Sequence, residues 1–269
     1  MTDSPWFAAA IAVFAWWFAT GAILWRVRVA DNGGHRAHLV SVVAGLPLLA
    51  GGIWLAARGA GDASVTGTYL GFFAALALWA FIELAFLSGV ITGPNRAPCP
   101  PDARLFDRFV RACGTILWHE AALLVTLCAL ALVPGGHPVA VLTFALLFGA
   151  RVLAQLNFFF GVPRINTQFI PRPLRHLPSH FRLSRASLFL PLSVGVLAVL
   201  TVGLLLLARN AATVDAGVGW ALLSTLAALA LVEHLFMVLP LPDDRLWRWM
   251  LPAAKTHSPA SLHEDANGL

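Results

Sequence analysis

The chain has 269 residues, of which 59% are hydrophobic and only 12% are Asp, Glu, Lys or Arg, and its formal net charge is +5. This composition excludes an ordinary soluble domain, because the charged residues are too few for so apolar a chain. It indicates an integral membrane protein.

Seven apolar segments are long enough to cross a bilayer core, which takes about 20 helical residues. In chain order they are residues 6–25, 37–57, 67–92, 110–133, 138–160, 187–208 and 217–241. No strand pattern competes with them, so we predict an all-α, polytopic membrane helical bundle. The first segment lacks a preceding basic region and a following cleavage site, and is interpreted as a retained span. Residues 1–252 are expected to form one transmembrane domain, and residues 253–269 a disordered cytoplasmic tail.

The basic residues divide unevenly between alternate loops. Fifteen of the eighteen Lys and Arg residues fall on one side, Arg58 and Arg209 fall on the other, and Arg151 lies within a span. Positively charged loops stay in the cytoplasm, so the N-terminus is predicted outside and the C-terminus inside. The basic face is expected to lie near anionic membrane lipid, and a nucleic-acid partner is not expected.

The loop between the fifth and sixth spans, "GVPRINTQFIPRPLRHLPSHFRLSR", mixes Arg with Ile, Leu and Phe, as an interfacial segment does. His176 and His180 stand at the spacing of two metal ligands on one helical face, but Pro178 between them weakens such a helix. A strip that lies on the membrane or docks a partner is therefore the favoured interpretation. The candidate docking residues are Arg172, Arg175, His176, His180 and Arg182.

Six ionisable residues interrupt the apolar spans, where a charge costs at least about 2.5 kcal/mol and tends to face the protein interior. From the expected cytoplasmic ends of four spans, their depths come out at roughly 12 to 15 Å. The matched depths predict one polar layer in the cytoplasmic half of the bundle. Its members are Glu83, His119, Glu120, Arg151, Glu233 and His234.

Three interpretations of this layer remain open: an ion network that fixes packing, a metal or cofactor site, and a proton or substrate path. The metal candidates are Glu83, Glu120, Glu233, His119 and His234. Di-iron bundles use Glu-x-x-His, whereas both pairs here are adjacent residues, which point about 100° apart around a helix. The packing network is therefore favoured over the metal site.

The seven-span layout, "LNFFFGVPRINTQFIPRPLRHLPSHF", "WHE" and "EHLFMVLPLPDDRLWRWML" resemble the photosynthetic complex assembly protein PuhE family of purple phototrophic bacteria. The resemblance covers nearly the whole chain and is most specific from Asn157 to Phe181. It implies a multi-pass protein of the bacterial cytoplasmic membrane that acts in assembly of the reaction centre and light-harvesting complex, or in bacteriochlorophyll supply. The partners implied are subunits of these complexes and other assembly factors.

The resemblance implies no catalytic residues. The cofactor stays open between bacteriochlorophyll and a divalent metal, which the unbalanced carboxylates of the polar layer could hold. A second hypothesis from another class stays open. It is a membrane-embedded, metal-dependent enzyme that acts on a tetrapyrrole or another lipophilic substrate.

Overall fold

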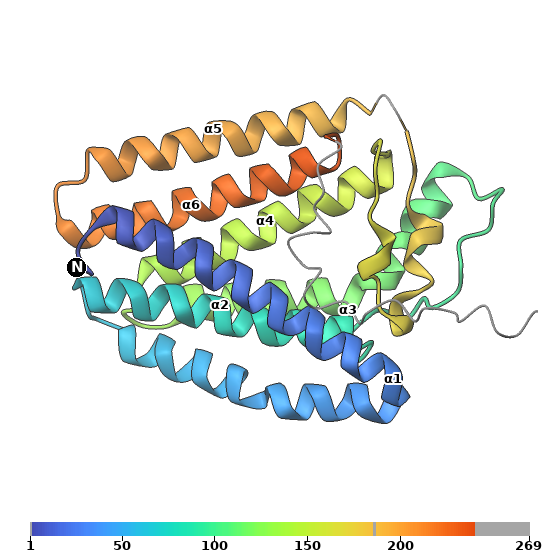
Figure 1. The fold of residues 1–269 in the computed structure, drawn as a ribbon, viewed down its shortest axis with the longest axis horizontal. Coiled ribbons are helices and arrows are strands. Elements are labelled where there is room, and N and C mark those ends of the chain that lie inside the picture. The colour runs from blue at the N-terminus through green and yellow to red at the C-terminus, as the bar shows by residue number, and fades with distance from the viewer. Residues whose placement is uncertain (1, 185–186, 240–269) are drawn as a thin grey trace, which may run out of the picture.

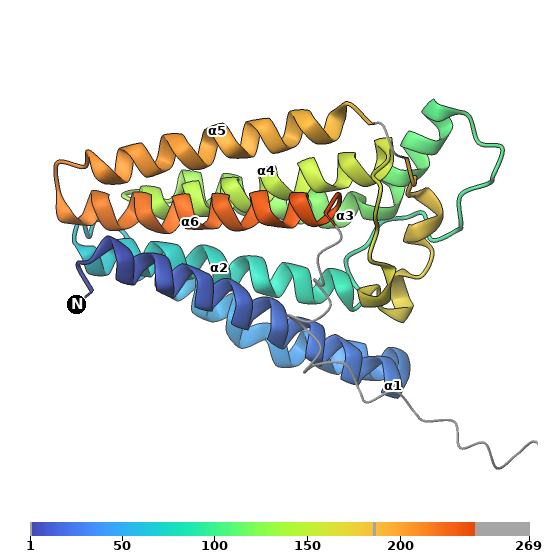
Figure 2. The same ribbon diagram turned by 45° about the horizontal axis from the view of Figure 1, so that its top comes forward.

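The computed structural model describes residues 2–184 and 187–239, which form a bundle of long α-helices (Figures 1 and 2). The helices are α1 (Pro5–Gly59), α2 (Val65–Leu87), α3 (Leu105–Leu132), α4 (Pro138–Phe160), α5 (Phe189–Arg209) and α6 (Val214–Phe236). Each of the six is long and apolar enough to cross a membrane. The predicted polytopic helical bundle is confirmed. The expected tail and the end of the last expected span lie outside the described residues.

The first two expected spans share α1, which reverses direction at Gly34 (Figure 1). Its 55 residues would measure about 80 Å if straight, far more than a hydrocarbon core of about 30 Å. Gly34 has φ 69° and ψ −161°, a region that is essentially reserved for glycine. Across the turn, His38 Nε2 lies 3.1 Å from Asp31 Oδ1. The two arms of α1 therefore supply two of the seven expected crossings.

Three buried glycines on the second arm of α1 bring it close to α2. Gly45, Gly52 and Gly59 recur every seven residues, so they lie along one face of the arm. A Cβ atom added to Gly52 would lie 3.1 Å from the backbone nitrogen of Leu78, and one added to Gly59 would lie 3.2 Å from Leu70 Cβ. Small residues that let helix backbones approach are a common basis of packing in membranes.

The interior of the bundle is built around α2 and α6, whose apolar stretches are the most buried of the six. One core cluster joins α1, α2, α4 and α6 through residues such as Ala12, Phe72 and Leu222. A second joins α2, α3 and α4 through Leu123 and Phe144. In the apolar stretches of the other four helices only 17% to 22% of the residues are buried, as expected of helices that face lipid.

The long connections gather at the end of the bundle away from the N-terminus (Figures 1 and 2). Residues 161–184, here called the cap loop, fold over this end and contain three short 3-10 helices, η1 (Thr167–Phe169), η2 (Arg172–Leu174) and η3 (Leu177–His180). The loop closes on itself, because the Val162 N–H donates to Arg182 O and the Ser184 N–H donates to Val162 O, both at 3.1 Å. It is therefore a packed element and not only a surface strip.

Candidate functional site

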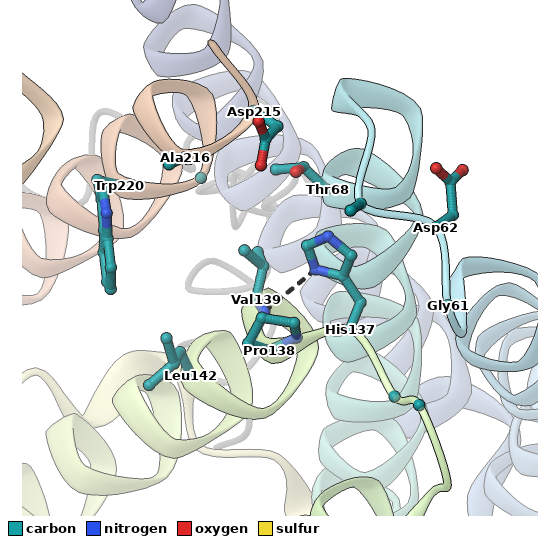
Figure 3. Close-up of a pocket in the computed structure, with 14 residues that line it drawn as sticks. Gly61, Asp62, Thr68, His137, Pro138, Val139, Leu142, Asp215, Ala216 and Trp220 are labelled. Carbon is teal, nitrogen blue, oxygen red and sulfur yellow. Dashed lines mark hydrogen bonds between the residues drawn. The ribbon is translucent and has the colours of Figure 1, made fainter. Parts of the chain in front are cut away.

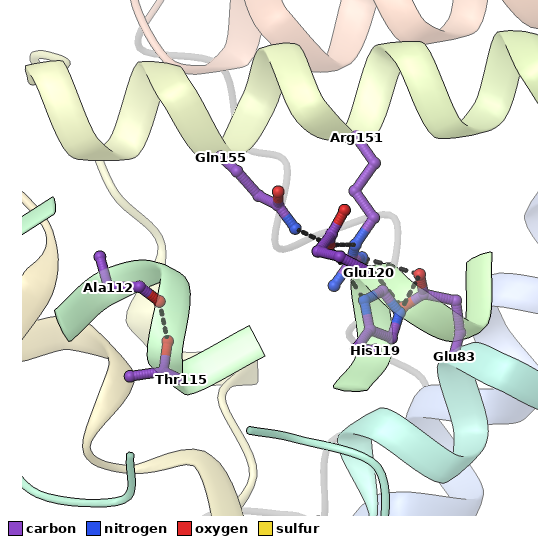
Figure 4. A network of polar contacts seen from close by, with 7 residues as sticks. All are labelled: Glu83, Ala112, Thr115, His119, Glu120, Arg151 and Gln155. Carbon is purple, nitrogen blue, oxygen red and sulfur yellow. Dashed lines mark hydrogen bonds and ion pairs between the residues drawn. The ribbon is translucent and has the colours of Figure 1, made fainter. Parts of the chain in front are cut away.

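Four of the six residues predicted in the polar layer meet between α2, α3 and α4 (Figure 4). Arg151 Nη1 lies 2.8 Å from Glu83 Oε1 and donates to Glu83 Oε2 at 3.0 Å. His119 stands between the two carboxylates, with Nε2 3.4 Å from Glu83 Oε1 and Nδ1 3.1 Å from Glu120 Oε1. Gln155, one turn beyond Arg151, donates to Glu120 Oε1 at 2.7 Å. We call these five residues the ion network.

Burial and aromatic contacts hold the ion network in place. His119 is fully buried, and the side chains of Glu83 and Arg151 are 12% and 22% exposed. Phe86 packs on His119 and Arg151, with its ring centroid 4.3 Å from that of His119 and 5.0 Å from Arg151 Cζ. The contacts join side chains of α2, α3 and α4, so the ion network can fix the packing of these three helices.

The connection before α3 sets the position of His119. Asn95 N–H donates to Gly114 O at 3.0 Å, and Thr92 O accepts from the His119 N–H at 3.2 Å, so backbone groups of α3 bond to this connection. The approach requires glycine at position 93, because a Cβ atom there would overlap the carbonyl oxygen of Gly114. Thr115 Oγ1 donates to Ala112 O within the same part of α3 (Figure 4). The segment from Thr92 to Asn95 thus anchors the turn of α3 that carries His119.

Glu233 and His234 take different positions on α6. Glu233 Oε1 accepts a hydrogen bond from Trp16 Nε1 at 3.1 Å. With Glu83 and Arg151 it lines a cavity of about 270 Å³, so it faces the ion network across space. His234 is buried, and its Nδ1 lies 2.8 Å from Ala230 O in the preceding turn of α6. The structure thus brings Glu233 near the other four predicted residues and leaves His234 apart.

The predicted metal ligands do not form a cluster in the described part of the chain. No group of three or more His, Cys, Asp or Glu side chains there could hold a metal ion. Arg151 instead contacts both carboxylates that were candidates on α2 and α3, and its Nε lies 3.9 Å from Glu120 Oε1.

A larger cavity of about 600 Å³ lies between α3, α4 and the cap loop. Glu120, Arg151 and Gln155 line it, so the ion network is accessible from this cavity. Its other walls are mostly apolar. They include Phe86, Phe109, Phe158, Phe159, Phe169 and Phe181, and His180 of η3. A mostly apolar chamber with a few polar groups is the usual form of a small-molecule site.

The five candidate docking residues of the cap loop divide between its surface and its interior. Arg175 and Arg182 are exposed. Arg172 is also exposed, but it ties the loop to α1, because its Nη1 donates to Asp31 O at 2.9 Å. His176 and His180 are 7% and 3% exposed. Burial, the largest cause, lowers the pKa of both imidazoles.

The opposite end of the bundle holds a cavity of about 330 Å³ that the sequence did not reveal (Figure 3). Three ionisable residues line it. Asp62 lies between α1 and α2, His137 precedes α4, and Asp215 is in the first turn of α6. His137 Nδ1 accepts from the Val139 N–H at 3.3 Å and caps α4. The three residues are far apart in sequence, and no spacing pattern connects them.

Comparison with known proteins gives a family and one relative. A family model described as "Protein of unknown function (DUF3623)" matches residues 1–258. A protein of Rhodobacter capsulatus, described as "Uncharacterized 30.4 kDa protein in puhA 5'region", is 52% identical over 255 residues, which cover 94% of this chain and 93% of the relative. No solved structure matches the chain.

Proposed function

The chain belongs to the DUF3623 family, and we propose that it is an assembly factor for the photosynthetic reaction centre and light-harvesting complex in the bacterial inner membrane. The observation that carries the proposal is the place of its relative in the puhA 5' region, a photosynthesis gene cluster of Rhodobacter capsulatus. The gene label shares its prefix with PuhE, the assembly-protein family that the sequence resembles. Both support a role in the biogenesis of photosynthetic complexes.

The end of the bundle that holds the cap loop offers a surface suited to docking. Arg175 and Arg182 are exposed there, and Leu183 and Leu188 are 72% and 89% exposed. Exposed apolar side chains beside arginines are typical of protein interfaces, in which Arg is enriched. We propose that this surface contacts a subunit of the photosynthetic complex, and that supply of bacteriochlorophyll is part of the same task.

The test is a double variant, Arg175→Gln with Arg182→Gln, expressed in Rhodobacter capsulatus cells that lack the relative. Neither side chain has a hydrogen bond or ion pair within the described residues, so the variant should insert at normal levels. Co-purification of reaction-centre and light-harvesting subunits should decrease, and so should the abundance of the assembled complex. Arg172 is kept because its bonds to Asp31 make it structural.

The matched control is Arg209→Gln, because Arg209 is an exposed arginine at the opposite end of the bundle. It should leave both readouts unchanged. If the double variant also matches wild type in co-purification and in complex abundance, the docking role of the cap loop is wrong.

A further inference from the structure

The 600 Å³ cavity beside the ion network has the size and lining of a site for a large lipophilic molecule. Cofactor and small-molecule sites measure about 300 to 1,000 Å³ and combine apolar walls with a few fixed polar groups. Here the walls carry six phenylalanines from α2, α3, α4 and the cap loop. Aromatic faces of this kind pack well against a planar ring system.

Within this lining, the tautomer of His180 is set by its neighbours. Its Nδ1 lies 3.3 Å from His176 O and 3.2 Å from Ser179 Oγ. A carbonyl oxygen can only accept, and the Ser179 hydroxyl already donates to His176 O at 2.7 Å. The proton of a neutral imidazole must therefore be on Nδ1, which leaves a lone pair on Nε2.

Nε2 of His180 is buried and has no hydrogen-bond partner in the described part of the chain. Such an atom is costly in a protein interior, where nearly all polar groups are satisfied. An Nδ1–H held by a backbone carbonyl is also the arrangement in which a histidine presents Nε2 to a metal, because the bond fixes the ring and raises the basicity of the ligand. His180 is thus prepared to bind a Lewis acid.

A lone imidazole cannot hold a free metal ion, and the described residues offer no cluster that could complete its coordination. A metal bound here must bring its other ligands with it, within a molecule that apolar walls accept. We propose that the cavity binds a metallotetrapyrrole and that Nε2 of His180 is its axial ligand. Glu120 and Arg151, which line the same cavity, would orient polar substituents of the ring. The relevance of a pigment-type ligand rests on the proposed function.

The experiment titrates the full-length protein in detergent with zinc protoporphyrin and with metal-free protoporphyrin, and follows the Soret absorption band. Wild type should bind zinc protoporphyrin more tightly than the metal-free ring, and the Soret band of the zinc form should shift as one imidazole coordinates the zinc. His180→Ala should weaken binding by about tenfold or more and abolish the shift. In His180→Gly, added imidazole should restore the shift. If His180→Ala does not fold, His180→Gln is measured in its place.

The matched control is His176→Ala. His176 is four residues away in the same loop, is buried, and also has an unpartnered Nε2 among the described residues, but it does not line the cavity. It should bind like wild type. The proposal is wrong if the His180 variants bind zinc protoporphyrin like wild type, or if His176→Ala loses as much affinity as His180→Ala. It is also wrong if wild type binds the metal-free ring as tightly as the zinc form.

Failure of this inference is distinguishable from failure of the proposed function. If zinc protoporphyrin does not bind through His180 while the Arg175 and Arg182 double variant still loses the complex, only the ligand assignment is wrong. If the ligand binds as expected but the assembled complex never depends on this chain, the assembly function is wrong.

Discussion

Among single residues, Arg151 is the one on which the ion network depends. It is the only guanidinium in contact with Glu83 and Glu120 among the described residues, and it reaches Glu83 through two short contacts. A buried ion pair adds little net stability compared with an apolar pair, but a carboxylate left without its partner is costly. Removal of Arg151 should therefore have a larger effect than removal of the whole Glu83–Arg151 pair.

We predict that Arg151→Met lowers the free energy of unfolding by about 3 to 5 kcal/mol, because it leaves buried carboxylates uncompensated. Adding Glu83→Leu to the same chain should recover part of the loss. The exposed control Arg209→Met should cost less than about 1 kcal/mol. Thermal and denaturant unfolding in detergent would measure all three. Equal stabilities for Arg151→Met and Arg209→Met would contradict the network.

A second residue-scale prediction concerns pH at the end of the bundle opposite the cap loop, where His137 caps α4 through an unprotonated Nδ1 (Figure 3). Burial lowers the pKa of His137, against the opposing effect of Asp62 and Asp215. Because the pKa of His137 in the folded state is below the unfolded value of about 6.5, the contribution of neutral His137 to the free energy of unfolding is complete above that pH. It decreases as the pH falls from there towards the folded pKa.

The comparison variant is His137→Asn, which keeps a capping oxygen that does not titrate. Between pH 8 and pH 5, its unfolding temperature should fall less than that of wild type, by an amount that corresponds to a cap of about 1 kcal/mol. Parallel curves for the two proteins would show that protonation of His137 does not matter to stability.

Among whole elements, α1 shows what a sequence pattern can and cannot give. Two apolar segments separated by "RVRVADNGGHR" predicted two spans. The tight helix–turn–helix geometry depends on the backbone of Gly34, and composition alone does not distinguish it from a longer loop. The seven-residue spacing of Gly45, Gly52 and Gly59 is visible in the sequence, but its partner helix is not.

We predict that Gly34→Ala destabilises the bundle by about 1 to 3 kcal/mol through backbone strain alone. A Cβ atom at this position would meet nothing within 4 Å, so steric contact is not involved. Gly51→Ala is the control, because Gly51 lies within the second arm of α1 and a Cβ atom there is also free of contacts. That variant should be neutral or up to about 1 kcal/mol more stable. The account of the turn is wrong if both variants behave alike.

For the candidate site, the sequence predicts how far along each helix a residue lies, but not in which direction around the helix axis its side chain points. The rise per residue fixes the depth of a side chain in its span, so a common layer for Glu83, His119, Glu120 and Arg151 could be predicted. The rotation of each helix depends on packing, so the sequence could not show that Glu233 faces the layer and His234 does not. The bonds from Thr92 and Asn95 to α3 were also unpredictable, because they join a loop to backbone groups of another element.

At the scale of the whole molecule, the topology agrees with the distribution of charge. The N-terminus and the C-terminal end of α6 lie at opposite ends of the bundle, and the long basic connections gather with the latter (Figure 1). By the distribution of basic residues, we expect the end with the long connections to lie in the cytoplasm and the short-looped end to lie outside. The orientation itself remains a prediction.

A reporter fused after Leu269 should be active only in the cytoplasm, and one placed at Asp3 only outside. The expectation follows from the fifteen basic residues on one side and two on the other. Enzyme reporters of opposite compartment specificity would measure it. Opposite signals would reverse the orientation, and matching signals at both ends would overturn the odd number of crossings.

The assembly function is tested most directly by the amount of reaction-centre and light-harvesting complex in membranes of Rhodobacter capsulatus. Cells that lack the 52% identical relative should show reduced near-infrared absorption of the assembled complexes, and expression of this chain should restore it. If the absorption is unchanged when the relative is absent, or if this chain inserts normally and restores nothing, the protein is not an assembly factor for these complexes.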